Sequence, residues 1–255
     1  FGYSIAFGDG NLFWGGLDKM FLIGITPDTL KGSIPEVLFF VFQMTFAIIT
    51  PALIVGAYVE RISFGFVMTF SGLWFGFNGG SQLAADGGAA MAITVTHISA
   101  AAASLSWALY ERIKYGKASL VGLVTGTIAG LASITPAAGW VTPVEALFIG
   151  AVAGVLCQLM CEVIKGWFKI DDTLDVFAVH GIGGIFGTLM LAVLGYAGWT
   201  EQAGSLLVVG LFTIVATYAL VKLVALVFPI RVSEEQEITG LDQSSHGERA
   251  YDLAS

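Results

Sequence analysis

The sequence predicts an all-α protein, a polytopic transmembrane helical bundle of about seven spans. Hydrophobic residues make up 56% of the 255 residues and charged residues only 12%, and the mean hydropathy is +0.83. A soluble domain of this length does not need so much apolar surface. In addition, no Asp, Glu, Lys or Arg occurs between Val176 and Thr200, and about 20 apolar residues suffice for a helix to cross a bilayer.

The chain begins with a helix end and a loop, which are followed by the spans. Phe1–Ala6 is interpreted as the end of a helix. The segment from there to Pro35 is rich in Gly, Asp and aromatic residues, which is typical of a loop at the membrane surface anchored by Trp14 and Phe21. We expect the spans at Leu38–Val59, Ile62–Ala85, Gly87–Tyr110, Ser119–Ala137, Val144–Trp167, Leu174–Leu194 and Leu206–Phe228.

Charged residues and turn signals separate the predicted spans. In chain order, the separating residues are Glu60 and Arg61, Asp86, the basic loop with Arg112, Lys114 and Lys117, the turn at Pro136 and Gly139, and Lys165 with Lys169. In a seven-span topology nearly all Lys and Arg fall on one side, which marks that side as cytoplasmic. We therefore expect a transmembrane domain over 1–228 and a cytoplasmic tail over 229–255.

Composition excludes several classes of function. The tail after Ile230 holds two arginines against six acidic residues, half of the net charge of −8, and a basic surface for nucleic acid is absent. Cys157 and Cys161 share a helix face but lack the further ligands of a zinc site, so we expect them to pack. The sequence shows no paired acid and base, nucleophile elbow, phosphate loop or metal cluster, so we predict neither an enzyme nor a cofactor.

His180 lies within the uncharged run and is the candidate functional centre. An imidazole is costly to desolvate in a membrane, so it usually faces a pore, a cavity or a partner. A buried histidine with local hydrogen bonds is an equally good interpretation of a lone His. The small residues around it let helices pack closely and favour the functional interpretation. They are Gly181, Gly183, Gly184 and Gly187.

Two aromatic segments precede it. Phe42 and Phe46 are four residues apart and share a helix face, although such stripes more often belong to the core or face lipid. Residues 74–81, WFGFNGGS, alternate aromatic with small side chains and end in a hydroxyl. Ring faces attract cations and a serine oxygen accepts a hydrogen bond, so this segment is able to form a cage for a small cation.

Six segments together resemble the ammonium transporter family (Amt/Mep/Rh), in its bacterial Amt form. They are GYSIAFGDG, FQMTFAIITPALIVGAYVERISF, WFGFNGGS, GLASITPAAGW, DDTLDVFAVHGIGGIFG and EEQEITGLDQSSHGERAYDL. They follow the family order over nearly the whole chain. The resemblance implies a homotrimer in the lipid bilayer of the inner (plasma) membrane, with ammonium or ammonia as its cargo.

The resemblance also implies roles for matching residues. Phe42 and Ser81 correspond to the external recruitment site, Phe46 and Phe77 to a stacked phenyl gate, and His180 to the pore. For Asp175, near the start of the pore helix, a helix cap and an electrostatic role are weighed equally. The tail resembles a segment that docks between subunits and supports contact with a PII-type signalling protein, through residues matching Glu235, Gly240, Leu241, Asp242, His246, Gly247 and Tyr251. From its composition alone, a disordered end is the alternative.

The chain departs from the family's eleven spans in two ways. It lacks the first span and nearly all of the second, and it joins the start of the fourth to the end of the sixth between Phe70 and Ser71. The missing segment includes the WGGG tryptophan and the DFAGGTVVH signature with an aspartate and the first pore histidine. His97 does not match that histidine and is expected to pack or to form a hydrogen bond.

Two functions therefore stay open. One is an ammonium/ammonia channel subunit that recruits ammonium at an aromatic site and conducts ammonia through a His-lined apolar pore. The other is a truncated, transport-defective subunit or a regulatory module that binds a PII-type protein. Because one imidazole and the largest cage aromatic are missing, we expect conduction by this chain alone to be poor or nil.

Overall fold

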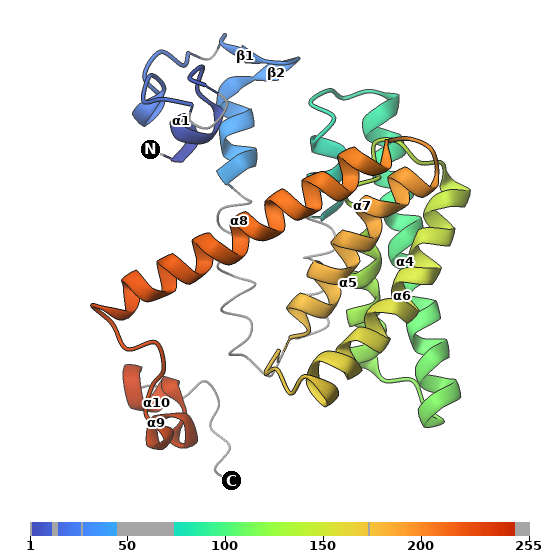
Figure 1. Ribbon diagram of the computed structural model, residues 1–255. Helices are drawn as coiled ribbons and strands as arrows, with labels where there is room; N and C mark the ends of the chain where they lie inside the picture. Colours follow the sequence, from blue (N-terminus) through green and yellow to red (C-terminus); the bar gives the residue numbers. More distant parts are fainter. Residues whose placement is uncertain (1, 12–14, 27, 45–73, 173, 248–255) are drawn as a thin grey trace. The chain divides into compact units, whose positions relative to one another are not determined.

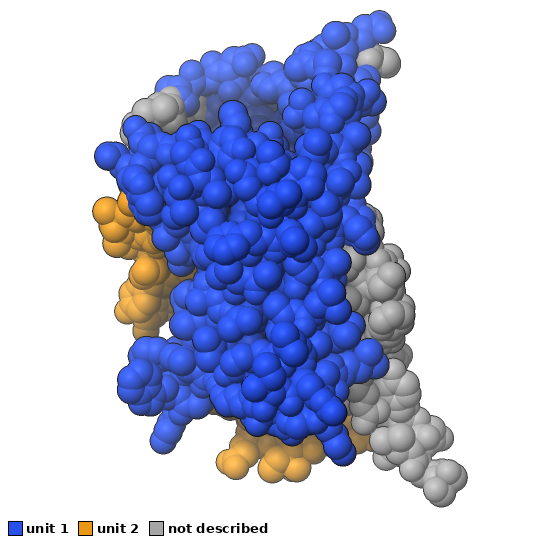
Figure 2. Space-filling model, turned by 90° about the vertical axis from the view of Figure 1, so that its right-hand side faces the viewer, with its two compact units in different colours: residues 1–202 blue, residues 203–255 orange. Residues whose placement is uncertain are grey.

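The computed structural model describes residues 2–11, 15–26, 28–44, 74–172 and 174–247. The chain divides into two compact units, Phe1–Gln202 and Ala203–Ser255, which Figure 2 colours separately. Helices dominate both units. The strands of the described residues form a single small hairpin. The predicted all-α fold is thus confirmed.

The N-terminal segment is held together by a buried carboxylate. It comprises α1 (Gly2–Phe7), η1 (Met20–Leu22) and a hairpin of β1 (Leu30–Lys31) and β2 (Ile34–Pro35), followed by helical residues 36–44. Glu36 is only 2% exposed and accepts hydrogen bonds of 2.8 Å from the Tyr3 hydroxyl and from Lys19 Nζ. These bonds connect α1, the loop and the helix that carries Phe42.

Four helices form the core of the first unit. They are α4 (Gly87–Tyr115), α5 (Leu120–Ile134), α6 (Pro143–Glu162) and α7 (Gly183–Val193). Helices α4, α5 and α6 contact one another, and α7 packs on α5 and α6 (Figure 1). Glycines permit the close crossings: a Cβ at Gly130 or Gly150 would overlap the backbone of Ser99 on α4. This is the small-residue packing expected of membrane helices.

Side-chain caps set where these helices begin. Asp86 Oδ1 accepts from the backbone N–H groups of Gly88 and Ala89 at 2.9 and 3.0 Å, and Ser119 caps α5. Thr142 and Glu145 form a capping box at α6. Because the first N–H groups of a helix have no intrahelical acceptor, such residues stabilise the starts that they define.

The later spans match the prediction better than the first two. Helix α4, the segment Pro143–Trp167 (α6 with the π-helix η2, Val163–Trp167) and α8 (Trp199–Ala225) are long and apolar enough to cross a membrane, and Leu120–Ile134 and Phe177–Val193 are shorter apolar helices. The predicted second span is helical over 74–80 and turns before Asp86, five residues earlier than expected. The remainder of the first two spans falls in 45–73, outside the described residues.

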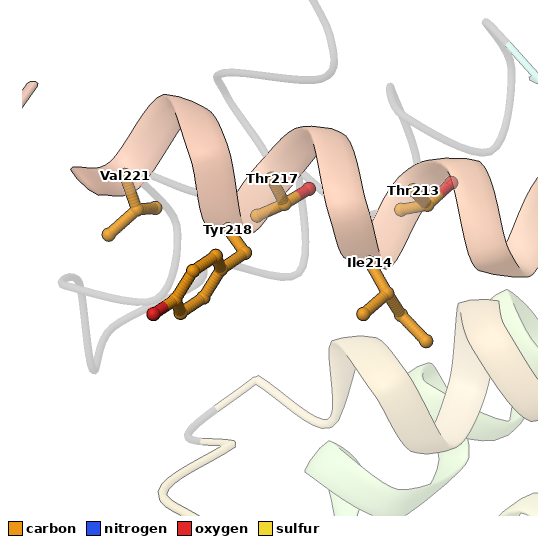
Figure 3. A pocket seen from close by; sticks show the side chains of 5 residues that line it. All are labelled: Thr213, Ile214, Thr217, Tyr218 and Val221. Atoms are coloured by element: carbon orange, nitrogen blue, oxygen red, sulfur yellow. The ribbon is translucent and has the colours of Figure 1, made fainter. Parts of the chain in front are cut away.

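Helix α8 begins at Trp199, seven residues before the predicted start. The predicted start lies after Glu201, but an acidic side chain in the first turn is favourable next to the positive end of the helix dipole. No residue of α8 is buried. The described residues that line a shallow hollow of about 410 Å³ all belong to this helix and are Thr213, Ile214, Thr217, Tyr218 and Val221 (Figure 3).

The polar tail contains two short helices, α9 (Glu234–Thr239) and α10 (Leu241–His246). Ser233 and Gln236 form a capping box at the start of α9, and Arg231 pairs with Glu237 at 3.1 Å. The described part of the tail is therefore ordered helix locally, which favours the folding interpretation over the disordered one.

Candidate functional site

His180 lies on a widened helical turn at the start of α7. This turn is the π-helix η3 (Phe177–Ile182), which continues directly into α7 at Gly183. Single π-turns recur at functional sites because the extra residue redirects side chains from the regular helical face. Asp172 Oδ1 and Oδ2 accept hydrogen bonds of 2.8 Å from the backbone N–H groups of Val176 and Phe177. Asp172, which the sequence did not single out, is thus the cap of this helix start.

Asp175 has a different contact. Its backbone adopts a left-handed conformation with φ 56°, and its Oδ1 lies 2.8 Å from Lys165 Nζ of η2. Of the two roles weighed for Asp175, the geometry therefore favours the electrostatic one, because Asp172 carries out the capping. Lys165 was expected only as a flanking cytoplasmic charge.

The His180 ring is half-buried and stacks on an aromatic side chain from another segment. Its centroid lies 5.7 Å from that of Trp74, with 23° between the planes. Trp74 opens the helical residues 74–80 and donates from Nε1 to Thr135 Oγ1 at 2.8 Å. The site thus brings together three parts of the chain. They are the helical residues 74–80, which follow the internal join, the end of α5, and η3.

A buried amide fixes residues 74–80 against the bundle. Asn78 is 8% exposed and Thr96 is fully buried. Asn78 Nδ2 donates to Thr96 Oγ1 of α4 at 2.9 Å and lies 3.5 Å from Thr135 Oγ1. Both threonine hydroxyls in turn donate to carbonyls one turn earlier in their chains. Sequence reasoning missed these partners, because the threonines have no distinctive pattern.

The proposed recruitment and gate residues meet at the other end of residues 74–80. The rings of Phe42 and Phe77 have centroids 6.2 Å apart and planes tilted by 49°. Phe42 Cε2 lies 3.3 Å from the position of a Cβ on Gly80, so a side chain at Gly80 would crowd the ring. Ser81 is exposed and its Oγ donates to the carbonyl of Phe77 at 2.7 Å. Phe42, Phe77 and Ser81 therefore form one group.

These residues share a helical stripe. Trp74, Phe77 and Ser81 are spaced i, i+3 and i+7, so they lie along one face, and seven residues of helix cover about 10 Å at 1.5 Å per residue. The stripe leads from His180 past an aromatic pair to an exposed hydroxyl. Aromatic faces in such an arrangement are able to attract a cation.

Other candidate residues are placed less completely. Phe46 and Tyr251 lie outside the described residues, and the side chains of Asp242 and His246 on α10 are also not described. Glu235 lies on α9, and Gly240 follows this helix with φ 92°. Leu241 begins α10, and Gly247 follows α10 with φ 67°.

His97 is exposed on α4, and the centroid of its ring lies 5.6 Å from that of Phe75. Cys157 and Cys161 are buried free thiols, as the packing interpretation expects.

Comparison with known proteins identifies relatives for most of the chain. The model of the Ammonium Transporter Family matches residues 1–75 and again 72–251. An ammonium transporter of Bacillus subtilis is 32% identical over 344 aligned residues, which cover 98% of this chain and 85% of the relative. The ammonium transporter Amt1 of Archaeoglobus fulgidus is 45% identical over 193 residues, covering 70% of this chain and 49% of the relative.

Solved structures agree with this fold. One described as a sensor Amt protein has a TM-score of 0.61 and 31% identity, covering 70% of this chain and 47% of that chain. Mep2 of Candida albicans has a TM-score of 0.61 and 29% identity, covering 71% and 45%. The chain thus spans about half the length of both structures and of the Archaeoglobus relative.

The comparisons also confirm the internal join. The two matches of the family model meet at residues 72–75, next to the predicted junction between Phe70 and Ser71. The Bacillus alignment is longer than this chain of 255 residues, so the relative contains a segment without a counterpart here. Membership of a transporter family also agrees with the prediction that the protein is not an enzyme. The multi-pass membrane chain described here belongs to the ammonium transporter family.

Proposed function

We propose that this protein is an ammonium/ammonia channel or transporter subunit. Phe42 and Ser81 recruit ammonium, Phe46 and Phe77 form the phenyl gate, and ammonia passes His180. The observation that carries the proposal is the stripe of Trp74, Phe77 and Ser81, which connects the stacked imidazole to the Phe42–Phe77 pair. Asp175 contributes electrostatically through Lys165.

Free energies explain why such a passage would carry ammonia rather than ammonium. A monovalent ion at the bilayer centre costs from about 3 to over 10 kcal/mol. Removing a proton from ammonium, with a pKa of about 9, costs only about 3 kcal/mol at pH 7. Deprotonation is therefore the cheaper route where the passage offers no full counter-charge. Potassium cannot lose a proton, which supplies the selectivity.

The finer assembly is part of the same proposal. Residues 1–228 form the transmembrane domain in the inner (plasma) membrane, as one subunit of a homotrimer. The tail, 229–255, lies in the cytoplasm and binds a PII-type signalling protein. Two features support a docking role for the tail, namely the capped helix α9 and the glycines with positive φ at 240 and 247.

Liposome transport tests the conduction step. The purified chain is reconstituted and methylammonium uptake is measured, with His180→Asn as the site variant and His97→Asn as the matched histidine control on α4. We expect the first variant to abolish the uptake that the chain supports and the second to leave it unchanged. Robust potassium current through the same liposomes, or uptake insensitive to His180→Asn, would contradict the proposal.

The confirmed internal join favours a second candidate, a transport-defective subunit or regulatory module. Because the missing segment matches the family region with the first pore histidine, the chain would keep the tail without an efficient pore. This alternative predicts no methylammonium uptake by the wild-type chain. It also predicts retention of a PII-type protein, which a variant ending at Ile230 would lose.

A further inference from the structure

The His180 ring stacks on one aromatic side chain among the described residues. Among the residues that the structure describes, the imidazole forms no hydrogen bond, and its ring partner is Trp74 at 5.7 Å between centroids. The terminal torsion of a histidine side chain has broad minima, so the ring turns readily unless a neighbour restricts it. The stacked indole is therefore one group that restricts this ring.

The indole is itself fixed by a directional bond. Trp74 Nε1 donates to Thr135 Oγ1 at 2.8 Å, and Thr135 Oγ1 donates to the carbonyl of Leu131 at 2.7 Å. Because the hydroxyl uses its single proton for Leu131, its lone pairs remain available for the indole N–H. A hydrogen bond at the ring edge limits rotation of the indole, and hence of the ring face against which His180 stacks.

The backbone that carries Trp74 is also anchored, one turn later. The buried Asn78 amide donates to Thr96 Oγ1 at 2.9 Å, and that hydroxyl donates to the carbonyl of Ala92 at 2.6 Å. Removing either partner would leave a buried polar group unsatisfied, which is costly. Trp74 is thus held both at its backbone and at its ring edge.

We propose that Trp74 is a positioning residue for His180, an inference that rests on the proposed passage of ammonia along this histidine. The indole covers one face of the imidazole, so the histidine meets its ligand through the edge nitrogens Nδ1 and Nε2. In the uncharged ring, one of these nitrogens donates a hydrogen bond and the other accepts one. This suits ammonia, which also donates and accepts hydrogen bonds. Thr135 acts through Trp74 by fixing the indole plane.

Histidine NMR tests the positioning directly and does not depend on transport. The chain has three histidines, so isotope-labelled histidine in nanodiscs gives three ring signals, assigned with His97→Asn and His246→Asn. We expect the His180 signals to be narrow and shifted upfield by the indole ring current. Trp74→Leu should remove that shift and broaden the signals, whereas Trp74→Phe should retain part of the shift.

Matched variants separate positioning from general loss of fold. Phe75→Leu removes the ring next to His97 and should move only the His97 signals, and Trp74→Leu should move only those of His180. Thr135→Val should broaden the His180 signals. Thr127→Val, at a threonine within α5 that also donates to a carbonyl, should not. His180 signals that are unchanged in both Trp74→Leu and Thr135→Val would overturn the inference.

A transport arm distinguishes this inference from the proposed function. If the wild-type chain takes up methylammonium, Trp74→Leu should lower uptake by about tenfold or more, because small misplacements of a functional group are costly, and Trp74→Phe should recover most of it. If the wild-type chain transports nothing, the proposed function fails, but the NMR shifts still decide the positioning. Normal uptake by Trp74→Leu would overturn the positioning role while leaving conduction intact.

Discussion

At the scale of single residues, two aspartates three positions apart have separate structural roles near His180. Asp172 accepts two backbone N–H groups, and Asp175 pairs with Lys165. The division follows from geometry: a cap precedes the first turn and points its oxygens back at free N–H groups. Asp175, with φ 56°, directs its carboxylate to another element.

The first prediction concerns the cap. Asp172→Ala should destabilise the folded chain by about 0.5–2 kcal/mol, because two N–H groups at the helix start lose their acceptor. Asp172→Asn keeps an acceptor oxygen and should lose less. Unfolding in mixed micelles measures both variants, and equal stability of Asp172→Ala and wild type would contradict the capping role.

The second prediction concerns pH at the N-terminal segment. Burial by itself would raise the pKa of Glu36, but hydrogen bonds from Lys19 and Tyr3 outweigh it and hold the pKa below its ordinary value. The bond to Glu36 in turn raises the pKa of Lys19. Because the folded pKa of Glu36 is the lower one, its stabilisation is complete above the unfolded value of about 4.3 and is lost as pH falls through the folded value.

Thermal unfolding in detergent at a series of pH values measures this effect. The wild-type Tm should drop on acidification below about pH 4.3, and Glu36→Gln should have a lower Tm at pH 7 with a flatter profile. Asp28→Asn, which changes an exposed carboxyl in the same segment, serves as the control and should follow the wild-type profile. A Glu36→Gln profile as steep as that of the wild type would refute the assignment.

At the scale of elements, backbone contacts between small residues hold the bundle around η3. Gly187 of α7 is buried against the carbonyl of Ser133 on α5, and Gly183 lies near the Ser133 hydroxyl. Gly184, between them, has no atom within 4 Å of its Cβ position. The glycines that follow His180 therefore differ in how closely they pack against α5, according to the helix face on which they lie.

The third prediction uses this difference. Gly187→Ala should destabilise the chain by about 1–3 kcal/mol, because its methyl group overlaps a backbone carbonyl that cannot move aside. Gly184→Ala should be neutral or stabilise by up to about 1 kcal/mol, because alanine favours the helix. Denaturation of both variants in parallel measures the contrast, and similar effects at the two positions would argue against the α5–α7 contact.

At the scale of the whole molecule, the chain is a family member that lacks an internal segment present in its relatives. The two matches of the family model overlap at 72–75, and the helices after that point still form a contiguous bundle of α4, α5, α6 and α7. Helix α8 has no buried residue among those described, so its apolar surface is available to lipid or to other protein segments.

The fourth prediction concerns orientation. After replacement of both native cysteines by alanine, single cysteines are introduced at Gly139 and at Lys117, in the loops at opposite ends of α5. A membrane-impermeant maleimide added to intact cells should label Gly139→Cys and not Lys117→Cys, because basic loops stay cytoplasmic. Labelling of Lys117→Cys from outside would invert the proposed topology and place the tail outside the cytoplasm.

The later helices could be predicted from the sequence, because hydropathy marks their interiors and charged or turn residues mark their ends. The residues Asp86 before α4 and Ser119 before α5, and the turn before Thr142, are local signals for the start of a helix. Such signals can be recognised from the sequence without knowledge of the fold. The second span was drawn too long, because the run from Ile62 to Ala85 continues through the join without a charge. The candidate site was predicted in part, as a set of residues identified by family resemblance without their mutual contacts.

The sequence by itself determined the membrane class, the family and the internal join, because these depend on composition and on ordered local motifs, and it marked His180 as the candidate functional centre. Only the tertiary structure decided that Trp74 stacks on His180, that Asp172 rather than Asp175 caps η3, and that Lys165 pairs with Asp175. Trp74 and its acceptor Thr135 are separated by 61 residues. Contacts of this kind depend on how helices cross, and that geometry is set by packing of the whole bundle rather than by any single segment.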